Sequence, residues 1–219
     1  MSAEYQEYTL FKNFHPEPLL WVIDCEAYHV NNKDIRLKEL AIVLVSDLKV
    51  HFNFHIRVPS RSYDQYNNSY AKKFLHQIPA RYGTTRFSDM VSLINNPTNI
   101  FYVHSVQKQQ LLENIFGRNI LYNHNLYCLK DTFNIHIPTA VIQSNHPHQC
   151  QLYQIHNLDF KHCALNKAIK YACYFRKSLD NIESDDPIWT LPVVNLLKQQ
   201  LSQEKQAETS PTPKEILKK

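Results

Sequence analysis

The sequence is poor in glycine and has no long apolar run. Only Gly83 and Gly117 occur among 219 residues, so a glycine-rich loop that binds phosphates through backbone amides is excluded. No apolar run approaches the ~18 residues of a membrane helix. The segment from Met1 to Glu7 is polar and acidic, unlike a signal peptide. We therefore expect a chain with no membrane partner that acts in the cytoplasm, the nucleus or both.

A complete set of disulfides is not expected either. The chain has five cysteines, which is an odd number, and the compartments named above are reducing. Free thiols and metal ligands are the remaining roles. The five residues are Cys25, Cys128, Cys150, Cys163 and Cys173.

Length and composition predict one folded domain with flexible ends. With 43% hydrophobic and 20% charged residues, the chain resembles ordinary globular proteins. We expect an N-terminal extension over residues 1–18, one domain over 19–202 and a disordered tail over 203–219, which is rich in Lys, Gln, Glu and Pro. The net charge of +4 permits nucleic-acid binding without requiring it.

The apolar patterns predict strands first and alternating elements later. Leu19–Asp24 suits a central strand buried on both faces, Glu39–Ser46 a second strand, and Val50–Val58 a third with one wet face. Three such strands form a meander. Further strands are expected at Asn99–His104 and Ile120–Tyr122, and helices at Ser69–Ile78, Arg86–Ile94, Gln107–Phe116 and His162–Lys177. This alternation indicates an α/β or α+β domain with a mixed sheet.

Two carboxylates follow the first apolar run. Asp24 and Glu26 are separated by one residue, so in a strand their side chains lie on the same face. Such a pair can hold a divalent cation, as in nucleases. Two acids at this spacing are common by chance, and the pair gains meaning only from the order of the motifs that follow.

The ordered motifs resemble the DEDDh 3′–5′ exonucleases of the RNase H-like superfamily. They are the first strand with its two acids, the Lys38-Glu-Leu-Ala-Ile-Val-Leu strand and the His162-Cys-Ala-Leu-Asn-Lys-Ala168 segment. The resemblance covers roughly residues 19–178. It implies an α/β, RNase H-like mixed central sheet flanked by helices, with Asp24, Glu26 and the general base His162 in the catalytic positions.

Two departures from that family concern charge. The resemblance implies an Asp five residues after His162 and another before a Leu pair, and the sequence has Lys167 and Lys108 there. Lysines would repel the Mg or Mn ions of an active relative, so the site residues would be vestigial. Alternatively, the alignment is shifted and both lysines are solvated surface groups. An active exonuclease would then recruit other acids, such as Asp159 or Asp89.

A second motif predicts a structural zinc ion. Glu39, Cys150, His156 and Cys163 resemble the Glu-Cys-His-Cys signature of the Maelstrom domain, and these residue types are zinc ligands. Spacing closer to that of the signature would place Tyr153 at the histidine position, and tyrosine cannot replace histidine as a ligand. His148 and His162 are therefore alternatives to His156. The alternative is that the two cysteines are core thiols.

The Maelstrom resemblance implies a non-enzymatic role in small-RNA (piRNA-type) silencing in the germline. Basic and aromatic residues after the third strand could contact single-stranded RNA, or form an ordinary helix face with core tyrosines. They include Tyr70, Lys72, Lys73, Arg81, Tyr82 and Arg86. The favoured hypothesis is an inactive exonuclease-like domain that binds single-stranded RNA or acts as a scaffold for protein partners in an RNA-silencing assembly. The alternatives are an active metal-dependent exonuclease and a pure protein-interaction module.

Overall fold

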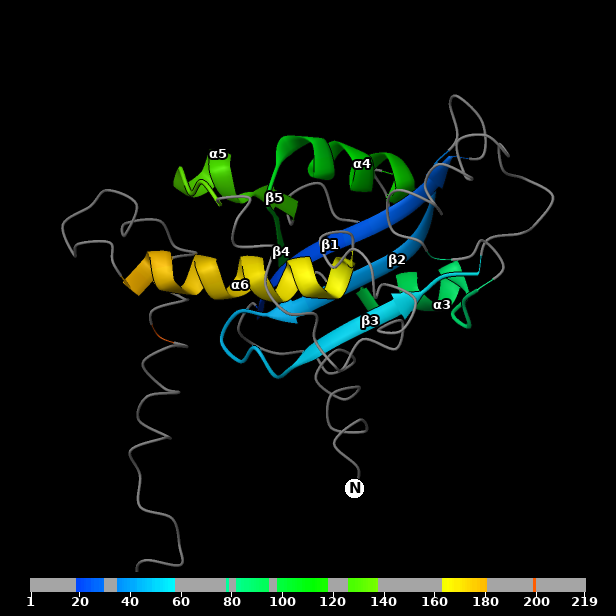
Figure 1. Cartoon of the computed structure of the whole chain (residues 1–219), viewed down its shortest axis with the longest axis horizontal. Helices are drawn as coiled ribbons and strands as arrows, with labels where there is room; N and C mark the ends of the chain where they lie inside the picture. The colour runs from blue at the N-terminus through cyan, green and yellow to red at the C-terminus, as the bar shows by residue number, and fades with distance from the viewer. Residues whose placement is uncertain are drawn as a thin grey trace, which may run out of the picture.

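The computed structural model describes most of the predicted domain, and Figure 1 shows its course. The described residues are 19–29, 35–57, 78, 82–94, 98–117, 126–137, 163–180 and 199. The extension over 1–18, the tail over 203–219, the strand predicted at Ile120–Tyr122 and all but the last residue of the helix predicted at Ser69–Ile78 lie outside them. Within the described part of the chain, no helix is both long and apolar enough to cross a membrane.

A mixed sheet of five strands forms the centre of the domain. The strands are β1 (Leu19–His29), β2 (Ile35–Leu44), β3 (His51–His55), β4 (Asn99–Val103) and β5 (Leu126–Cys128). They lie in the order β3-β2-β1-β4-β5. β2 is antiparallel to β1 and β3, whereas β4 and β5 run parallel to β1. The predicted meander and mixed sheet are both confirmed.

β1 is longer than its apolar run predicts. It continues past Asp24 to His29 because β2 pairs with it along nearly its whole length, whereas β4 pairs only with its first residues, Leu19 to Val22. Every residue from Leu20 to Glu26 is buried, as expected for a central strand. Asp24 and Glu26 therefore lie in the part of β1 that follows its pairing with β4.

A β-bulge interrupts the pairing of β1 with β2. Glu26 lies opposite Glu39, but Ala27 lies opposite Leu37, so Lys38 is an extra residue in β2. The Lys38 carbonyl accepts a hydrogen bond from Ile56 N at 2.8 Å, and Lys38 Nζ donates to Ile56 O at 3.1 Å. Burial lowers the pKa of this ammonium to about 8. The bulge thus joins β2 to the end of β3 and sets Glu39 against Glu26.

Helices cover both faces of the sheet. They are α3 (Phe87–Ile94), α4 (Val106–Phe116), α5 (Leu129–Phe133) and α6 (Ala164–Asp180). One face carries Leu20 and Val22 against α5 and α6, and the other carries Trp21 and Ile23 against α3 and α4. In Figure 1, α6 lies across β1 and β2, which are the strands that it contacts most. This position brings α6 over the two carboxylates of β1.

Two local predictions differ from the structure. β3 does not have the wet face expected from its alternation, because His51 and Asn53 are half-buried and His55 is only 2% exposed. The ring of Tyr82 covers His55 from outside the strand, with ring centroids 5.6 Å apart. The helix predicted from His162 to Lys177 begins at Ala164 and continues to Asp180.

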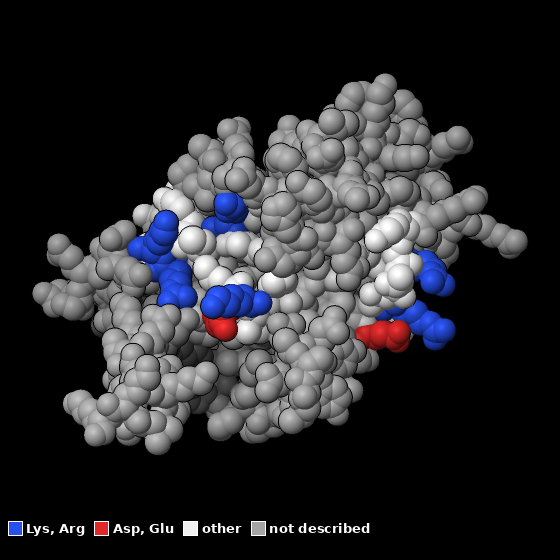
Figure 2. Space-filling view, turned by 60° about the horizontal axis from the view of Figure 1, so that its bottom comes forward, with Lys and Arg blue, Asp and Glu red and all other residues white. Residues whose placement is uncertain are grey.

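Charged side chains are unevenly placed on the surface. On the face shown in Figure 2, Lys and Arg side chains gather at two places, each with an acidic side chain beside them. One of these places involves α6, whose exposed side carries several of the described basic residues.

Candidate functional site

Asp24 and Glu26 lie on the face of β1 that α6 covers. Asp24 is fully buried and Glu26 is 9% exposed. Their shared orientation follows from the two-residue period of the strand, as the sequence predicts. Cys25 points to the opposite face and belongs to the core beneath α4. The strand therefore delivers two carboxylates to one buried point.

Lys167 supplies a cation to both carboxylates. It lies in the first turn of α6 with its side chain directed at β1, and it is 7% exposed. Its Nζ lies 2.7 Å from Asp24 Oδ2 and donates a hydrogen bond to Glu26 Oε1. One ammonium thus bridges the two acids.

Lys108 supplies a second cation from α4. Ser105 is the N-cap of this helix, and its side chain accepts a hydrogen bond from Lys108 N at 3.4 Å. From the first turn the side chain reaches Asp24 Oδ1 at 3.3 Å and donates to Cys25 O. Its side chain is 18% exposed, so Lys108 borders the surface. Asp24 is therefore held between two ammonium groups.

The four groups keep one another charged. Burial by itself would raise the pKa of Asp24 and of Glu26, but the two ammonium groups outweigh it and hold both carboxyl pKa values below the ordinary range. Burial would likewise lower the pKa of Lys167 and Lys108, yet the carboxylates raise both above the usual value for lysine. The cluster contains two negative and two positive charges. It is neutral overall without a metal ion.

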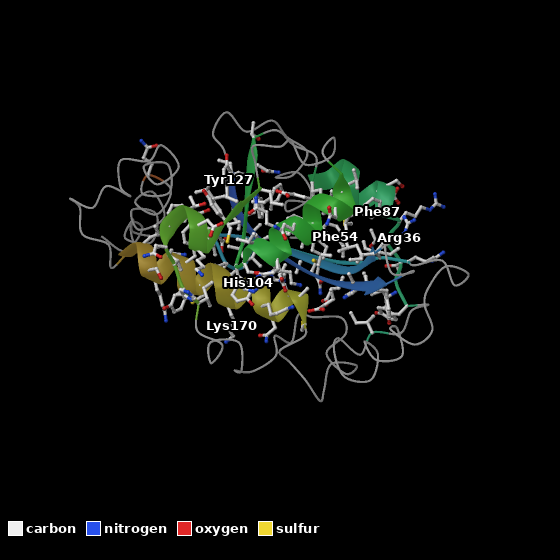
Figure 3. All side chains as sticks on the ribbon, turned by 90° about the horizontal axis from the view of Figure 1, so that it is seen from above. Arg36, Phe54, Phe87, His104, Tyr127 and Lys170 are labelled. Atoms are coloured by element: carbon white, nitrogen blue, oxygen red, sulfur yellow. The ribbon has the colours of Figure 1, made fainter. Side chains whose placement is uncertain are left out.

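Three neighbours complete the cluster, and one of them is an unreactive thiol. Burial raises the pKa of Cys25 to about 12, so its thiol stays protonated. His104, at the end of β4, stacks on Tyr171 of α6 with ring centroids 4.6 Å apart. Burial lowers the pKa of His104, although Asp24 opposes this effect. Figure 3 shows His104 on the side of α6 that faces the sheet.

Sequence reasoning missed His104 and Tyr171, although each carries a positional signal. His104 follows β4, a strand that runs parallel to β1 and ends beside it. Tyr171 lies four residues after Lys167 and so shares its face of α6. Both positions could have been found by asking which residues accompany the carboxylates and lysines in space.

Glu39 forms a second buried group, beside the first. Its Oε2 accepts a hydrogen bond from Ala164 N at 3.1 Å, and its Oε1 lies 3.6 Å from His55 Nε2 and 3.9 Å from Cys163 Sγ. Asn166 N also donates to Cys163 Sγ at 3.4 Å. Glu39 and Cys163 together satisfy amide groups at the start of α6.

Of the four predicted zinc ligands, the structure places two and leaves the other two undescribed. Glu39 and Cys163 lie together, but Cys150 and His156 lie outside the described residues. His55 was not predicted near them, because its strand pattern assigned it to a solvent-facing side. Among the residues that the structure describes, no group of three His, Cys, Asp or Glu side chains is arranged to hold a metal ion.

The predicted RNA-binding residues are mostly unplaced. Tyr70, Lys72, Lys73 and Arg81 lie outside the described residues, as does His162 of the catalytic set. Arg86 is exposed just before α3. Tyr82 is half-buried against His55, so part of its ring contacts the protein itself.

Comparisons with known proteins give similarities of fold only. No family model and no curated protein matches the chain. Among solved structures, the RNase domain of the yeast Pop2 protein has a TM-score of 0.49 at 10% identity, covering 80% of this chain and 82% of that one. The nuclease domain of 3'hExo, a DEDDh family member bound to rAMP, has a TM-score of 0.44 at 13% identity, with 77% and 95% covered.

A third similar structure is the zinc-bound form of the E. coli exonuclease I complex with single-stranded DNA. Its TM-score is 0.46 at 13% identity, and the match covers 90% of this chain. The chain spans less than half the length of exonuclease I, 46% of which is matched. These similarities transfer no activity, ligand or residue role.

The structure confirms the predicted mixed central sheet flanked by helices. The order β3-β2-β1-β4-β5, with β2 alone reversed and helices on both faces, agrees with the α/β fold class expected from the sequence. In this domain, the two carboxylates of β1 meet lysines from α4 and α6. The arrangement can neutralise buried acids without metal. The next described carboxylate, Glu39 opposite Glu26, accepts a hydrogen bond from the start of α6 instead.

Proposed function

We propose that the chain is a catalytically inactive exonuclease-like domain that binds single-stranded RNA or acts as a scaffold. One observation carries the inactive part: Lys167 Nζ contacts Asp24 and Glu26 together, and Lys108 Nζ lies 3.3 Å from Asp24. The acids that would hold catalytic metals are thus already neutralised by the protein.

Metal binding would require the lysines to leave. A divalent cation needs its carboxylate oxygens at roughly 2.0–2.6 Å, and the ammonium of Lys167 stands at these oxygens. An ion entering beside it would meet like charge at close range in a buried site. Moving the ammonium away would leave a buried charge without its partners, which is strongly destabilising.

The alternative of an active exonuclease gains no support from the described acids. It needs more carboxylates beside Asp24. Asp89 is exposed in the first turn of α3, and α3 packs on the opposite face of the sheet. Asp159 lies outside the described residues. The lysine contacts therefore favour the inactive reading.

The RNA-binding or scaffold role rests on weaker support. A net charge of +4 is compatible with nucleic-acid binding. Single-stranded RNA as the ligand, partners in an RNA-silencing assembly of the piRNA type, and action in the cytoplasm or nucleus follow from the resemblance to the Maelstrom domain. A pure protein-interaction module remains the alternative for a chain that binds no RNA.

A nuclease assay tests the inactive reading. The purified chain is incubated with end-labelled single-stranded RNA and DNA in magnesium or manganese, beside an EDTA control and the Asp24→Ala/Glu26→Ala variant. We expect no shortening of either strand in any sample. Cleavage by the wild type that both controls lack would overturn the proposal. On a native gel, a shifted RNA band would support binding, and no shift would leave a scaffold.

A charge exchange tests why the site is inert. In the Lys108→Asp/Lys167→Asp variant four carboxylates would face one another, so we expect manganese to raise its melting temperature by stabilising the folded state. The wild type should show no such rise. A wild type that manganese stabilises, in a manner that Asp24→Ala/Glu26→Ala removes, would contradict lysine neutralisation.

We also propose a structural zinc ion at Glu39 and Cys163, with Cys150 and a histidine as further ligands. The 3.9 Å separation of Glu39 Oε1 and Cys163 Sγ supports it, because carboxylate and thiolate ligands of one zinc ion lie at about this distance. Metal analysis of protein purified without chelators should give about one zinc per chain and less in Cys163→Ser. Zinc-free, folded wild-type protein would refute the site.

A further inference from the structure

One basic surface lies away from the carboxylate cluster. It consists of Lys49 in the turn between β2 and β3 and of Lys170, Arg176 and Lys177 on α6, and we call it the α6 basic surface. Lys49 and Lys177 are exposed, and the other two are partly exposed. Figure 2 shows Lys and Arg side chains gathered in this part of the molecule, and Figure 3 shows Lys170 on the outer side of α6.

Hydrogen bonds hold the two segments of this surface together. Arg176 Nη1 donates to Ser46 O at 3.0 Å, which fixes the last third of α6 to the turn that carries Lys49. Within the turn, Lys49 N donates to Asp47 Oδ1 at 3.0 Å. Arg176 and its neighbour Lys177 are thereby held beside the turn that carries Lys49, and Lys170 extends the surface along α6.

The surface has an excess of positive charge. Over residues 46–50 and 170–180, which the structure describes, the sequence has four basic residues and two acidic ones, Asp47 and Asp180. None of the ion pairs found among the described residues uses Lys49, Lys170 or Lys177. By contrast, Lys108 and Lys167 are neutralised inside the cluster. Lys49, Lys170 and Lys177 thus form a group of basic side chains with no ion pair among the described residues.

The helix dipole explains only part of this charge. Arg176 and Lys177 are near the C-terminus of α6, where cations oppose the negative end of the helix. Lys49 is outside the helix and Lys170 is in its middle, so neither has that role. Tyr174 lies between Lys170 and Lys177 on the same side of the helix and is half-buried.

We infer that the α6 basic surface binds the phosphate backbone of single-stranded RNA, an inference that rests on the proposed RNA-binding role. Lysines with no carboxylate partner among the described residues can neutralise phosphates. Tyr174 packs partly against the core, and the rest of its side chain lies between two of these lysines for contact with a base. An acidic protein segment would use the charges but not the ring. The contact surface is thereby placed on α6 rather than in the lysine-filled site.

Fluorescence anisotropy tests the inference. The probe is a labelled oligouridylate of about 20 nucleotides, longer than a typical single-strand site. The test variant is Lys49→Glu/Lys177→Glu, because both residues are exposed. The matched control is Arg36→Glu/Lys130→Glu, which makes the same charge change at exposed positions elsewhere. Circular dichroism and thermal melting confirm that all proteins are folded.

We expect the test variant to bind at least about tenfold more weakly, with a salt slope reduced by about 1.4, or 0.7 for each lost phosphate contact. The control should retain most of the wild-type affinity and slope. Equal weakening of both variants, or none in the test variant, would overturn the surface assignment while RNA binding stands. A wild type that binds no RNA would overturn the RNA-binding role as well. Binding of polyglutamate in place of RNA would assign the surface to an acidic protein and refute the inference.

Discussion

Two glutamates lie opposite each other in the sheet, yet the protein neutralises them differently. Glu26 of β1 pairs directly with Glu39 of β2, and both are buried on the face that α6 covers. Like charges in this position destabilise a sheet. α6 resolves the conflict twice: its first amide, at Ala164, donates to Glu39, and Lys167 contacts Glu26.

The difference lies in the kind of partner. Glu26 faces an ammonium, which remains charged at physiological pH because neighbouring carboxylates raise the pKa of Lys167. Glu39 faces an amide, an imidazole and a thiol, which carry no fixed charge. The first carboxylate is therefore committed to an internal ion pair. The second keeps partners that can change with a metal ion, as the zinc proposal requires.

Removing the ammonium should have the largest effect. In Lys167→Met, Asp24 and Glu26 would remain buried and lose their shared cation, which typically costs about 3–5 kcal/mol for a buried ion pair. The measurement is the free energy of unfolding in urea at neutral pH. Lys170→Met is the matched control, because Lys170 lies on the same helix and its side chain is only half-buried.

A small effect of Lys167→Met, similar to that of Lys170→Met, would break the comparison. It would mean that Glu26 and Asp24 are stabilised without Lys167, for example by water or a cation. The ammonium would then not be the reason that the site tolerates two acids.

Removing the partner of the α6 amide should have a smaller effect. Glu39→Leu deletes a buried cap of the helix, which costs about 1–2 kcal/mol. Glu39→Gln keeps an oxygen for Ala164 N and also removes the repulsion of Glu26, so it should cost less than half as much. Urea unfolding measures both variants. Both variants are compared with EDTA present, so that the proposed zinc ion does not contribute. If Glu39→Gln is then as costly as Glu39→Leu, the charge of Glu39 itself is required, which would contradict the Ala164 amide as its main partner.

Much of the cluster of two carboxylates and two lysines around β1 follows from the sequence. The strand period places Asp24 and Glu26 on one face. Lys167 was expected there through the resemblance to the DEDDh exonucleases, which implies an Asp five residues after His162. Lys108 follows from the Leu pair in α4. These predictions depend on local geometry and on the order of motifs, and the structure brings all four residues together. The mixed sheet was predictable for the same reason.

The position of Glu39 depends on the β-bulge at Lys38, which no local sequence pattern predicts. If the pairing of Ala27 with Leu37 continued without a bulge, Glu26 would face Lys38 and form an ordinary cross-strand ion pair. The extra residue shifts Glu39 into that place instead. His55 is likewise buried by Tyr82, a contact between distant segments. Alternation along one strand cannot predict either outcome.

The pH dependence of stability should distinguish the two glutamates most finely. In the wild type, the pKa of Asp24 is held below 3.8 and that of Glu26 below 4.5. Their contribution to stability is present above those values and is lost only as the pH falls through the depressed values.

Lys167→Met removes the nearest cation, and burial should then raise the pKa of Glu26 above 4.5. Its folded state would bind a proton before its unfolded state does. As the pH is lowered from about 7 to about 5, the free energy of unfolding of Lys167→Met should therefore rise relative to that of the wild type. The rise is at most about 1.4 kcal/mol per pH unit for each proton bound. Lys170→Met serves as the control curve, since this variant leaves Lys167 in place. Parallel curves for Lys167→Met and the wild type would show that the ammonium does not set the charge of Glu26.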